Sequence, residues 1–226
     1  MHRIPDEMSF DHAASFDLTY GTAFHGLVPR GQVGVGDSVL VLGAAGGCGS
    51  AAVQIGRALG AHVIAVAGGP EKVALASELG ADAVVDHTQL DGDRALSQRV
   101  LELTEGRGVD AVYDPVGGAD VRDVLRCLAW NGRYLVVGFA DGAIPTVPLN
   151  LTILKSISLV GVAYGASAIV DPAANDAAFA QLFDWYRAGL VPPHVGHRFP
   201  LAEGAAAIAT LRDRGALGKV VVDIAG

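Results

Sequence analysis

Cysteine is scarce in this chain, because Cys48 and Cys127 are the only two among 226 residues. They form no Cys-x-x-Cys pair, so the sequence supports neither a disulfide framework nor a zinc knuckle, and we expect a reducing, cytoplasmic compartment. No apolar run approaches the ~18–20 residues of a membrane-spanning helix. The N-terminal stretch MHRIPDEMSFDH also lacks the apolar core of a signal peptide, so no association with a membrane is predicted.

Positive charge is scarce as well. The 16 Lys and Arg residues are outnumbered by 24 Asp and Glu, which leaves a net charge of −8, and no cluster of basic residues stands out. Such a chain has no electrostatic attraction to nucleic acid or to an anionic membrane, so we exclude both as partners. With 51% hydrophobic residues, it has instead the composition of a well-filled α/β core.

The chain is instead rich in short apolar runs, which alternate with helix-like segments. The continuous apolar character of these runs is typical of strands that are buried on both faces. They lie at residues 39–42, 62–67, 83–86, 111–114, 133–138 and 157–162. We therefore predict an α/β fold, a doubly wound parallel six-stranded Rossmann sheet, followed from residue 173 by a C-terminal helix–strand segment.

A glycine-rich loop, GAAGGCG, follows the first of these strands. Read as A-x-G-x-x-G, with Ala44, Gly46 and Gly49, it suits Rossmann dehydrogenases. Read as G-x-x-x-G-x-G, with Gly43 and Gly47 before Gly49, it suits short-chain dehydrogenases, and the spacing of a methyltransferase loop fits less well. In each case glycine lets the backbone approach a phosphate, and the N-terminus of the following helix favours its charge. The strand–loop–helix context predicts nucleotide binding.

Two further absences decide between these interpretations. None of the five tyrosines is followed four places on by Lys, which excludes the Tyr-x-x-x-Lys of short-chain dehydrogenases. The second strand ends in VAGG at residues 66–69, where an NAD enzyme or a methyltransferase would carry a ribose-binding carboxylate. A small residue there leaves room for a 2′-phosphate, and Lys72 can supply a cation. We therefore predict NADPH (NADP+) rather than NADH as the cofactor.

These motifs accompany longer stretches such as IPDEMSFDHAASFDLTYGTAFHGL, GDSVLVLGAAGGCGSAAVQIGRALGA, GRGVDAVYDPVGG and FPLAEGAAAIATLRDRGALGKVVVDI. On them, and almost end to end, the chain resembles the zinc-independent, zeta-crystallin-like quinone oxidoreductase branch of the medium-chain dehydrogenase/reductases. The resemblance implies a crossover helix region at 1–30, a Rossmann dinucleotide-binding domain at 31–195 and a C-terminal return segment at 196–226. It also implies that an N-terminal GroES-like substrate domain, to which that segment normally returns, is lacking.

The resemblance further implies which residues surround the cofactor. Three would bind the pyrophosphate through backbone N–H groups: Gly46, Gly47 and Cys48. Four would lie around the adenosine 2′-phosphate: Gly68, Lys72, His87 and Arg214. Two residues after the fourth strand would border the cofactor: Pro115 and Val116. Two after the fifth strand would meet the nicotinamide carboxamide through their backbone: Phe139 and Ala140. Thr22 would lie near the nicotinamide ring.

Several of these residues have an ordinary structural interpretation as well. His87 could be an exposed loop histidine, Arg214 could cap the end of its helix, and the Thr22 hydroxyl could bond its own helix backbone. Cys48 is interpreted as a small residue that packs under the loop, with a reactive thiol at a helix N-terminus as the alternative.

No metal site is predicted. In zinc-dependent relatives a ligand precedes the segment that matches Thr22 by a few residues, and Leu18 occupies the matching position here, with Asp17 beside it. His194 and His197 form an H-x-x-H pair in a loop rich in Pro and Gly, but no third ligand is near in the sequence.

By resemblance, the activity is hydride transfer from NADPH to a small electrophilic acceptor, either a quinone or an α,β-unsaturated carbonyl. An enoyl-thioester or alkenal reductase and a non-catalytic NADPH-binding module remain open. Because the substrate half of the cleft belongs to the lacking domain, we name no catalytic residue and expect weak or no activity from this chain alone. We also expect a homodimer joined through the apolar strand at 156–162, and leave open where residues 197–226 pack.

Overall fold

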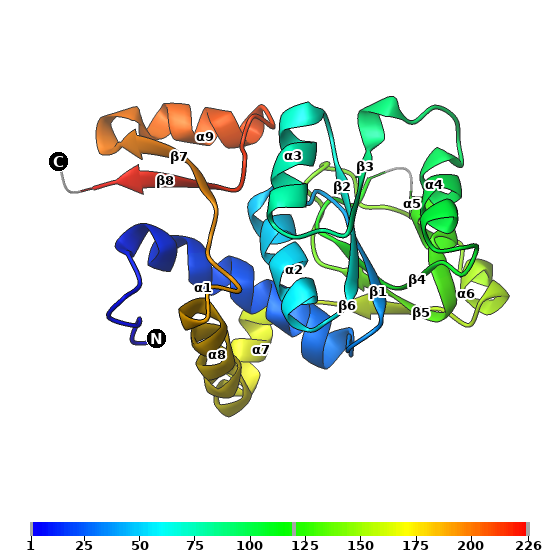
Figure 1. The fold of residues 1–226 in the computed structure, drawn as a ribbon, viewed down its shortest axis with the longest axis horizontal. Helices are drawn as coiled ribbons and strands as arrows, with labels where there is room; N and C mark the ends of the chain where they lie inside the picture. Colours follow the sequence, from blue (N-terminus) through cyan, green and yellow to red (C-terminus); the bar gives the residue numbers. More distant parts are fainter. Residues whose placement is uncertain (1, 119–120, 225–226) are drawn as a thin grey trace.

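The protein is described from a computed structural model, which covers residues 2–118 and 121–224. Six parallel strands form one sheet in the order β3-β2-β1-β4-β5-β6 (Figure 1). Their bounds are β1 (Ser38–Val41), β2 (His62–Ala67), β3 (Ala83–Asp86), β4 (Val109–Asp114), β5 (Leu128–Val136) and β6 (Ser158–Gly161). This order, which reverses between β1 and β4, is that of a doubly wound Rossmann sheet, so the predicted fold class is confirmed.

Helices cover both faces of the sheet (Figure 1). One face packs against α1 (Phe10–His25), α2 (Gly47–Ala58), α3 (Pro70–Glu78) and α8 (Pro172–Arg187). The other packs against α4 (Ala95–Leu103), α5 (Val121–Arg126) and α6 (Asn150–Leu154). In β1 and the residue after it, Val39 and Val41 contact the first layer while Leu40 and Leu42 contact the second, and all four are buried. A continuous apolar run is therefore what two covered faces require.

Aromatic residues close the first face of the sheet. Phe16 and Tyr20 of α1 stack with ring centroids 4.4 Å apart. The Tyr20 hydroxyl donates to Gln54 Oε1 of α2 at 2.5 Å, and the Gln54 amide donates to the Pro192 carbonyl at 2.9 Å. These hydrogen bonds join α1 and α2 to Pro192, which lies in the segment that follows α8. Among the described residues, none of the helices combines the length and the apolar character needed to cross a membrane.

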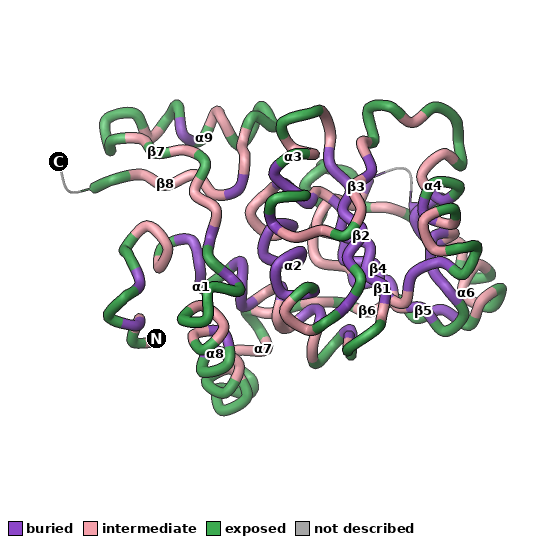
Figure 2. The backbone as a smooth tube through the Cα atoms, in the orientation of Figure 1, coloured by how far each residue is buried: buried purple, intermediate pink, exposed green. Residues whose placement is uncertain are grey.

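A second, two-stranded parallel sheet stands beside the first (Figure 1). It consists of β7 (Val195–Pro200) and β8 (Lys219–Asp223), and α9 (Gly204–Arg212) connects them. Its strands are half-buried or exposed, whereas β1 and β2 are almost wholly buried (Figure 2). The Gly218 N–H donates to the Ala45 carbonyl at 2.7 Å. The start of β8 is therefore attached to the glycine loop of the large sheet.

The fifth strand differs from the sequence-based expectation. We predicted it at residues 133–138, but β5 already begins at Leu128. Its register with β4 shifts from the pair Val109–Leu128 to the pair Ala111–Arg133, so the intervening residues form an irregularity within the strand. The connection between β5 and β6 contains the short helix α6.

Candidate functional site

The loops that follow the strands gather at the carboxyl edge of the large sheet. The loops after β2 and β3 lie on one side of the β1–β4 reversal, and those after β4 and β5 lie on the other. In a sheet of this order a ligand binds in the crevice between the two halves, over the first βα turn. Here that turn is the glycine loop at residues 43–49, between β1 and α2.

Close contacts that only glycine permits shape this loop. Gly43 has a φ of +59°, and a Cβ on it would lie 2.9 Å from Val116 Cγ2. A Cβ on Gly49 would collide with the Gly43 carbonyl, so the first turn of α2 lies directly on the loop. Around Gly46 the nearest atom to such a Cβ would be the Gly43 oxygen, at 3.4 Å. Packing within the protein therefore does not require a glycine at Gly46. The missing side chain leaves space on the outer side of the loop, where a ligand could approach the backbone.

The N-terminus of α2 is suited to an anion. Its N-cap residue is Gly46, so no N-cap side chain accepts a hydrogen bond from the first turn. The first N–H groups of a helix also lack partners within the helix. Lys219 Cδ lies 2.8 Å from the position of a Cβ on Gly47, and the Lys219 charge acts on the neighbouring Cys48 thiol. A cation near the positive end of a helix is unfavourable unless an anion joins it. This arrangement is compatible with the phosphate contact predicted for the loop, and sequence reasoning missed Lys219.

The Cys48 side chain is half-buried in the first turn of α2. Burial raises the pKa of its thiol, and nearby Lys219 opposes this less strongly. A thiol with a raised pKa is protonated at neutral pH and is a poor nucleophile. The structure thus favours the packing interpretation of this side chain over the reactive one.

The residues that end β2 and β3 are connected to each other. Asp86 Oδ1 accepts the Gly69 N–H at 3.0 Å and also the N–H and hydroxyl of Thr88 at 2.9 and 2.7 Å. These hydrogen bonds hold the pKa of Asp86 below its usual value, and the bond from Gly69 has the largest effect. His87 Nε2 lies 2.5 Å from the position of a Cβ on Gly68, so any side chain there would displace the imidazole. Gly68 and the exposed His87 therefore form one surface.

Lys72 and Arg214 come together although 142 residues separate them. Lys72 Nζ donates to the Arg214 carbonyl at 2.7 Å, and Arg214 Nη2 donates to Asp141 Oδ1 at 2.9 Å. Arg212, rather than Arg214, lies in the last turn of α9, where it pairs with Asp213. The guanidinium of Arg214 thus does not cap its helix. The backbone of Arg214 lies beside Lys72, in line with the sequence-based hypothesis, whereas its guanidinium lies at Asp141. The 2′-phosphate contact stays a prediction.

Asp114, at the end of β4, holds the following loop in shape. Its Oδ1 accepts the N–H groups of Val116 and Gly117 at 2.7 and 2.9 Å, and its Oδ2 accepts the Tyr134 hydroxyl at 2.5 Å. Burial, and then the contact with Asp114, raises the pKa of Tyr134. This buried carboxylate therefore has a structural task, and we assign it no catalytic one.

The loop after β5 is bonded to the loop after β4. The Ala140 N–H donates to the Pro115 carbonyl at 3.1 Å, and the Asp141 N–H donates to the Val116 carbonyl at 2.9 Å. The Phe139 side chain beside them is 40% exposed. The four residues predicted here thus form one wall of the crevice. Since the Ala140 N–H is already used, a nicotinamide contact at that residue would need its carbonyl.

Thr22 and its neighbours lie on α1. The Thr22 hydroxyl donates to the Leu18 carbonyl at 2.6 Å, which is the bond within the helix that we weighed as its alternative. Tyr164, which begins α7 (Tyr164–Val170), covers Gly21 so closely that a Cβ there would collide with the ring. Its hydroxyl donates to Asp17 at 3.2 Å, and burial followed by that carboxylate raises its pKa to about 12. Sequence reasoning did not place Tyr164 near this segment.

Within residues 2–118 and 121–224, no group of three or more His, Cys, Asp and Glu side chains is placed to hold a metal ion. His197 Nε2 accepts the Leu217 N–H at 3.3 Å, and the His194 carbonyl accepts the Lys219 N–H at 2.8 Å. In this structure both histidines of the H-x-x-H pair therefore hold the start of β8 against β7.

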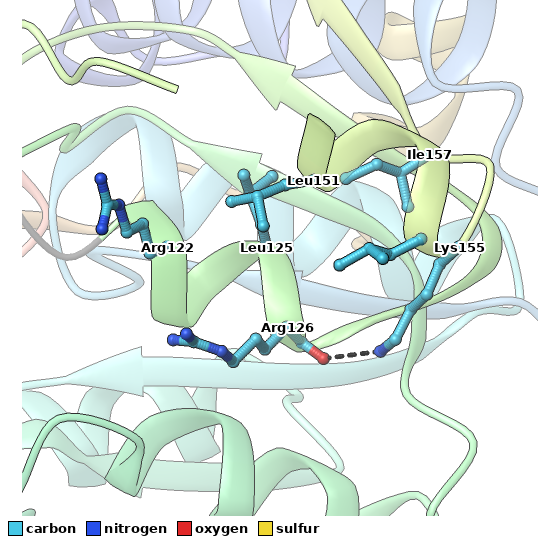
Figure 3. A pocket seen from close by; sticks show the side chains of 7 residues that line it. Arg122, Leu125, Arg126, Leu151, Lys155 and Ile157 are labelled. Carbon is cyan, nitrogen blue, oxygen red and sulfur yellow. Dashed lines mark hydrogen bonds between the residues drawn. The ribbon is translucent and has the colours of Figure 1, made fainter. Parts of the chain in front are cut away.

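A pocket of about 50 Å³ lies away from the crevice, between α5 and α6 (Figure 3). Leu125, Leu151 and Ile157 line it, and Lys155 closes one side by donating to the Arg126 carbonyl at 2.9 Å. Because residues 125–126 and 155–157 precede β5 and β6, the pocket lies at the amino edge of the sheet. It is separate from the loops at the carboxyl edge.

Comparison with known proteins identifies the family. The family model described as "Zinc-binding dehydrogenase" matches residues 47–185, from the first turn of α2 to near the end of α8. The chain belongs to this family. A quinone oxidoreductase-like protein 2 homolog of Nematostella vectensis is 35% identical over 223 residues, which cover 98% of this chain and 60% of that relative. The structure of Escherichia coli quinone oxidoreductase complexed with NADPH superposes with a TM-score of 0.89 at 27% identity, covering 98% of this chain and 68% of that one.

A further relative is a much larger protein. The mycocerosic acid synthase-like polyketide synthase of Mycobacterium tuberculosis is 29% identical over 222 residues, which cover 98% of this chain but 10% of the synthase. The chain spans 60–63% of the length of the quinone oxidoreductase-like relatives that it matches. It is therefore a member of an oxidoreductase superfamily with a Rossmann sheet, and its own activity is a matter for proposal.

Proposed function

We propose that this chain binds NADPH and provides the cofactor half of a reductase that transfers hydride to a small electrophilic acceptor. The observation that carries the proposal is the open glycine loop at the N-terminus of α2, with Lys219 beside it and Lys72 over the next strand. The loop suits a pyrophosphate. Lys72 and Arg214 suit a further phosphate on the adenosine ribose, because β2 ends in Ala67-Gly68 without a carboxylate.

Bound NADPH would supply the hydride, and the protein would supply orientation. The N–H groups of Gly46, Gly47 and Cys48, together with the Lys219 ammonium, would hold the pyrophosphate. The wall formed by the loops after β4 and β5 would fix the nicotinamide end and exclude water from one of its sides. Preorganised loops of this kind are effective because they need little rearrangement when the ligand arrives.

For the acceptor we propose a quinone or an α,β-unsaturated carbonyl. The names of the sea-anemone and Escherichia coli proteins support the quinone. The second candidate is an enoyl-thioester or alkenal reductase, and the match to a polyketide synthase supports it. A non-catalytic NADPH-binding module is the third class. It would bind the cofactor and reduce no acceptor.

The remaining parts of the proposal concern the whole protein. We name no catalytic residue and expect this chain alone to be weak or inactive, because it spans only 60–63% of the length of the quinone oxidoreductase-like relatives that it matches. We propose that activity is independent of zinc, although the family description names that metal. The position matching a zinc ligand is Leu18, and the adjacent Asp17 accepts a hydrogen bond from Tyr164.

We also propose a homodimer through residues 156–162 and a cytoplasmic location. Among residues 2–118 and 121–224, β6 pairs with β5 alone, and its Leu159 side chain is 38% exposed. The Gly161 carbonyl accepts from Arg30 Nε at 3.0 Å, which occupies one backbone acceptor of this strand. An edge strand of this kind offers its other backbone groups to a second chain. The two free thiols, Cys48 and Cys127, suit a reducing compartment.

The test is NADPH oxidation, followed by absorbance, with a simple quinone, an alkenal and an enoyl thioester offered in turn to the zinc-free chain. We expect NADPH binding with slow or no turnover, and where turnover is seen the fastest of the three reactions names the acceptor class. Binding without turnover by a form that has the full length of the quinone oxidoreductase-like relatives would favour the non-catalytic module. Failure to bind either dinucleotide would reject the proposal, and rapid quinone reduction would contradict the expectation of weak activity.

A further inference from the structure

Asp141 is a carboxylate in a crevice that the proposed function fills with an anion. It lies in the loop after β5, and its Oδ2 is 2.9 Å from the position of a Cβ on Gly118. The Asp141 N–H donates to the Val116 carbonyl at 2.9 Å, and the Gly118 N–H donates to the Ala143 carbonyl at 3.2 Å. Two loops bonded in this way hold the carboxylate in one place, over the backbone that follows β4.

Arg214 reaches this carboxylate from the other half of the sheet. Lys72 of α3 holds its carbonyl at 2.7 Å, and the end of α9 lies beside α3 in Figure 1. Its guanidinium nevertheless binds Asp141, beyond β5. β2 and β5 are separated by β1 and β4. The contacts from Lys72 through Arg214 to Asp141 therefore connect the part of the site that follows β2 with the loop that follows β5.

The backbone of Arg214 is anchored independently of its side chain. Its φ is +58°, in the turn after α9, where the Gly215 N–H donates to the Thr210 carbonyl at 3.0 Å. Because Lys72 holds the carbonyl, the backbone of Arg214 is anchored apart from the ion pair that its guanidinium makes with Asp141.

We propose that Asp141 is a specificity-determining counter-charge: it competes with the 2′-phosphate of NADPH for Arg214, and so limits how strongly the protein prefers NADPH to NADH. The inference rests on the proposed function, since it needs a dinucleotide in the crevice. NADH carries no 2′-phosphate and leaves the Arg214–Asp141 pair in place. NADPH binding exchanges one anionic partner of Arg214 for another.

The size of the effect follows from the exposure of the pair. The Arg214 side chain is 71% exposed and that of Asp141 is 38% exposed. Exposed ion pairs of this kind shift an equilibrium by up to about fivefold. Replacing Asp141 should therefore tighten NADPH binding by about two- to fivefold at low salt, and the gain should shrink at high ionic strength, where the pair is screened.

The experiment compares the dissociation constants of NADPH and NADH for the wild type, Asp141→Asn, Arg214→Gln and the double variant. The control is Asp213→Asn, which makes the same change of charge one residue from Arg214 but removes a pair with Arg212. We expect Asp141→Asn to bind NADPH about two- to fivefold more tightly with NADH unchanged, the control to match the wild type, and the double variant to match Arg214→Gln. Asp141→Ser serves as a second variant if the amide disturbs the loop.

Three results would overturn the inference. Weaker NADPH binding by Asp141→Asn would mean that the carboxylate positions Arg214 for the phosphate. An equal gain in the Arg214→Gln background, or in the control, would mean that Asp141 acts only as a general negative charge. An unchanged preference in a protein that binds NADPH would remove the inference and leave the proposed function intact. If the wild type binds neither dinucleotide, both fail together.

Discussion

The two sheets of this protein are built on opposite principles. In the six-stranded sheet, β1 is wholly buried and the residues of β2 after His62 are buried too. In the two-stranded sheet, β7 alternates between half-buried and exposed residues, and β8 has no fully buried residue (Figure 2). The first sheet is therefore stabilised by its own two-layered core. The second has one covered face at most, and its connection to the site is the stretch from Arg214 to Lys219.

This difference assigns the two sheets different parts of the site. The large sheet provides the loops that shape the crevice, and it holds them by backbone contacts. The segment that leads into the small sheet adds the charges of Arg214 and Lys219, which lie before and at the start of β8, to the charge of Lys72 on α3. Variants in the large sheet should therefore change stability, whereas variants at the contact between the two should change affinity.

Alkaline pH should produce the largest effect, and it should act on the large-sheet body alone. Burial raises the pKa of Tyr20 and Tyr113, and burial with the Asp114 contact raises that of Tyr134, while residues 195–226 contain no tyrosine. Above pH ~10 the unfolded chain releases these protons and the folded protein does not. Each tyrosine then costs up to about 1.4 kcal/mol of stability per pH unit.

The measurement is the free energy of unfolding from denaturant titrations followed by circular dichroism between pH 8 and 12. The tyrosines should leave the free energy of unfolding unchanged below pH ~10 and should lower it steeply above that pH. A stability that stays constant from pH 10 to 12 would contradict the burial of these hydroxyls.

The glycines of the two regions should respond differently to alanine. Gly49→Ala forces a Cβ against the Gly43 carbonyl and should cost about 2–3 kcal/mol, with loss of NADPH binding. Gly204→Ala, at the start of α9, meets no atom within 4 Å and should be neutral or stabilising by up to about 1 kcal/mol. Equal losses of stability in the two variants would show that the loop is not tightly packed.

A matched deletion in one strand of each sheet should measure their cores. Val112 in β4 is wholly buried, and Val221 in β8 is half-buried. Val112→Ala should destabilise the protein by about 2 kcal/mol, because the lost transfer free energy is joined by a cavity. Val221→Ala should cost less than about 1 kcal/mol by the same measure. If Val221→Ala lowers the free energy of unfolding as much as Val112→Ala does, the two sheets do not differ in how tightly their strands are packed.

Lys72→Gln should have the smallest effect on stability and a specific effect on affinity. Loss of the ammonium should weaken NADPH binding by about tenfold, because a charged hydrogen bond to phosphate is removed, and should leave NADH binding unchanged. Arg99→Gln on α4 is the control, since its cation pairs with Glu102 on another face. A similar loss for NADH would place Lys72 outside the 2′-phosphate site.

The large sheet could be predicted from the sequence because each of its strands is a short run of β-branched and aliphatic residues. Residues 39–42 were expected as a strand, and β1 lies at Ser38–Val41. Continuous apolar character fits only a strand covered on both sides. The early start of β5 was missed because Trp130-Asn131-Gly132 carries a turn signal, and a turn signal does not distinguish an irregularity within a strand from a turn before it.

The site was predictable where local motifs define it and unpredictable where distant segments meet. The glycine loop and Lys72 follow directly from strand–loop–helix patterns. Arg214 was placed by family resemblance, and the structure brings its carbonyl to Lys72. Lys219 and Asp141 were missed because no local pattern reports that β8 begins beside Gly47, or that two residues 73 positions apart form an ion pair.

The most direct test of NADPH binding is a calorimetric titration of the 226-residue chain with NADPH and with NADH. We expect NADPH to bind at least about tenfold more tightly than NADH, because Lys72 and Arg214 would bind the additional phosphate. Equal affinity for the two dinucleotides, a preference for NADH, or no binding of either would contradict it.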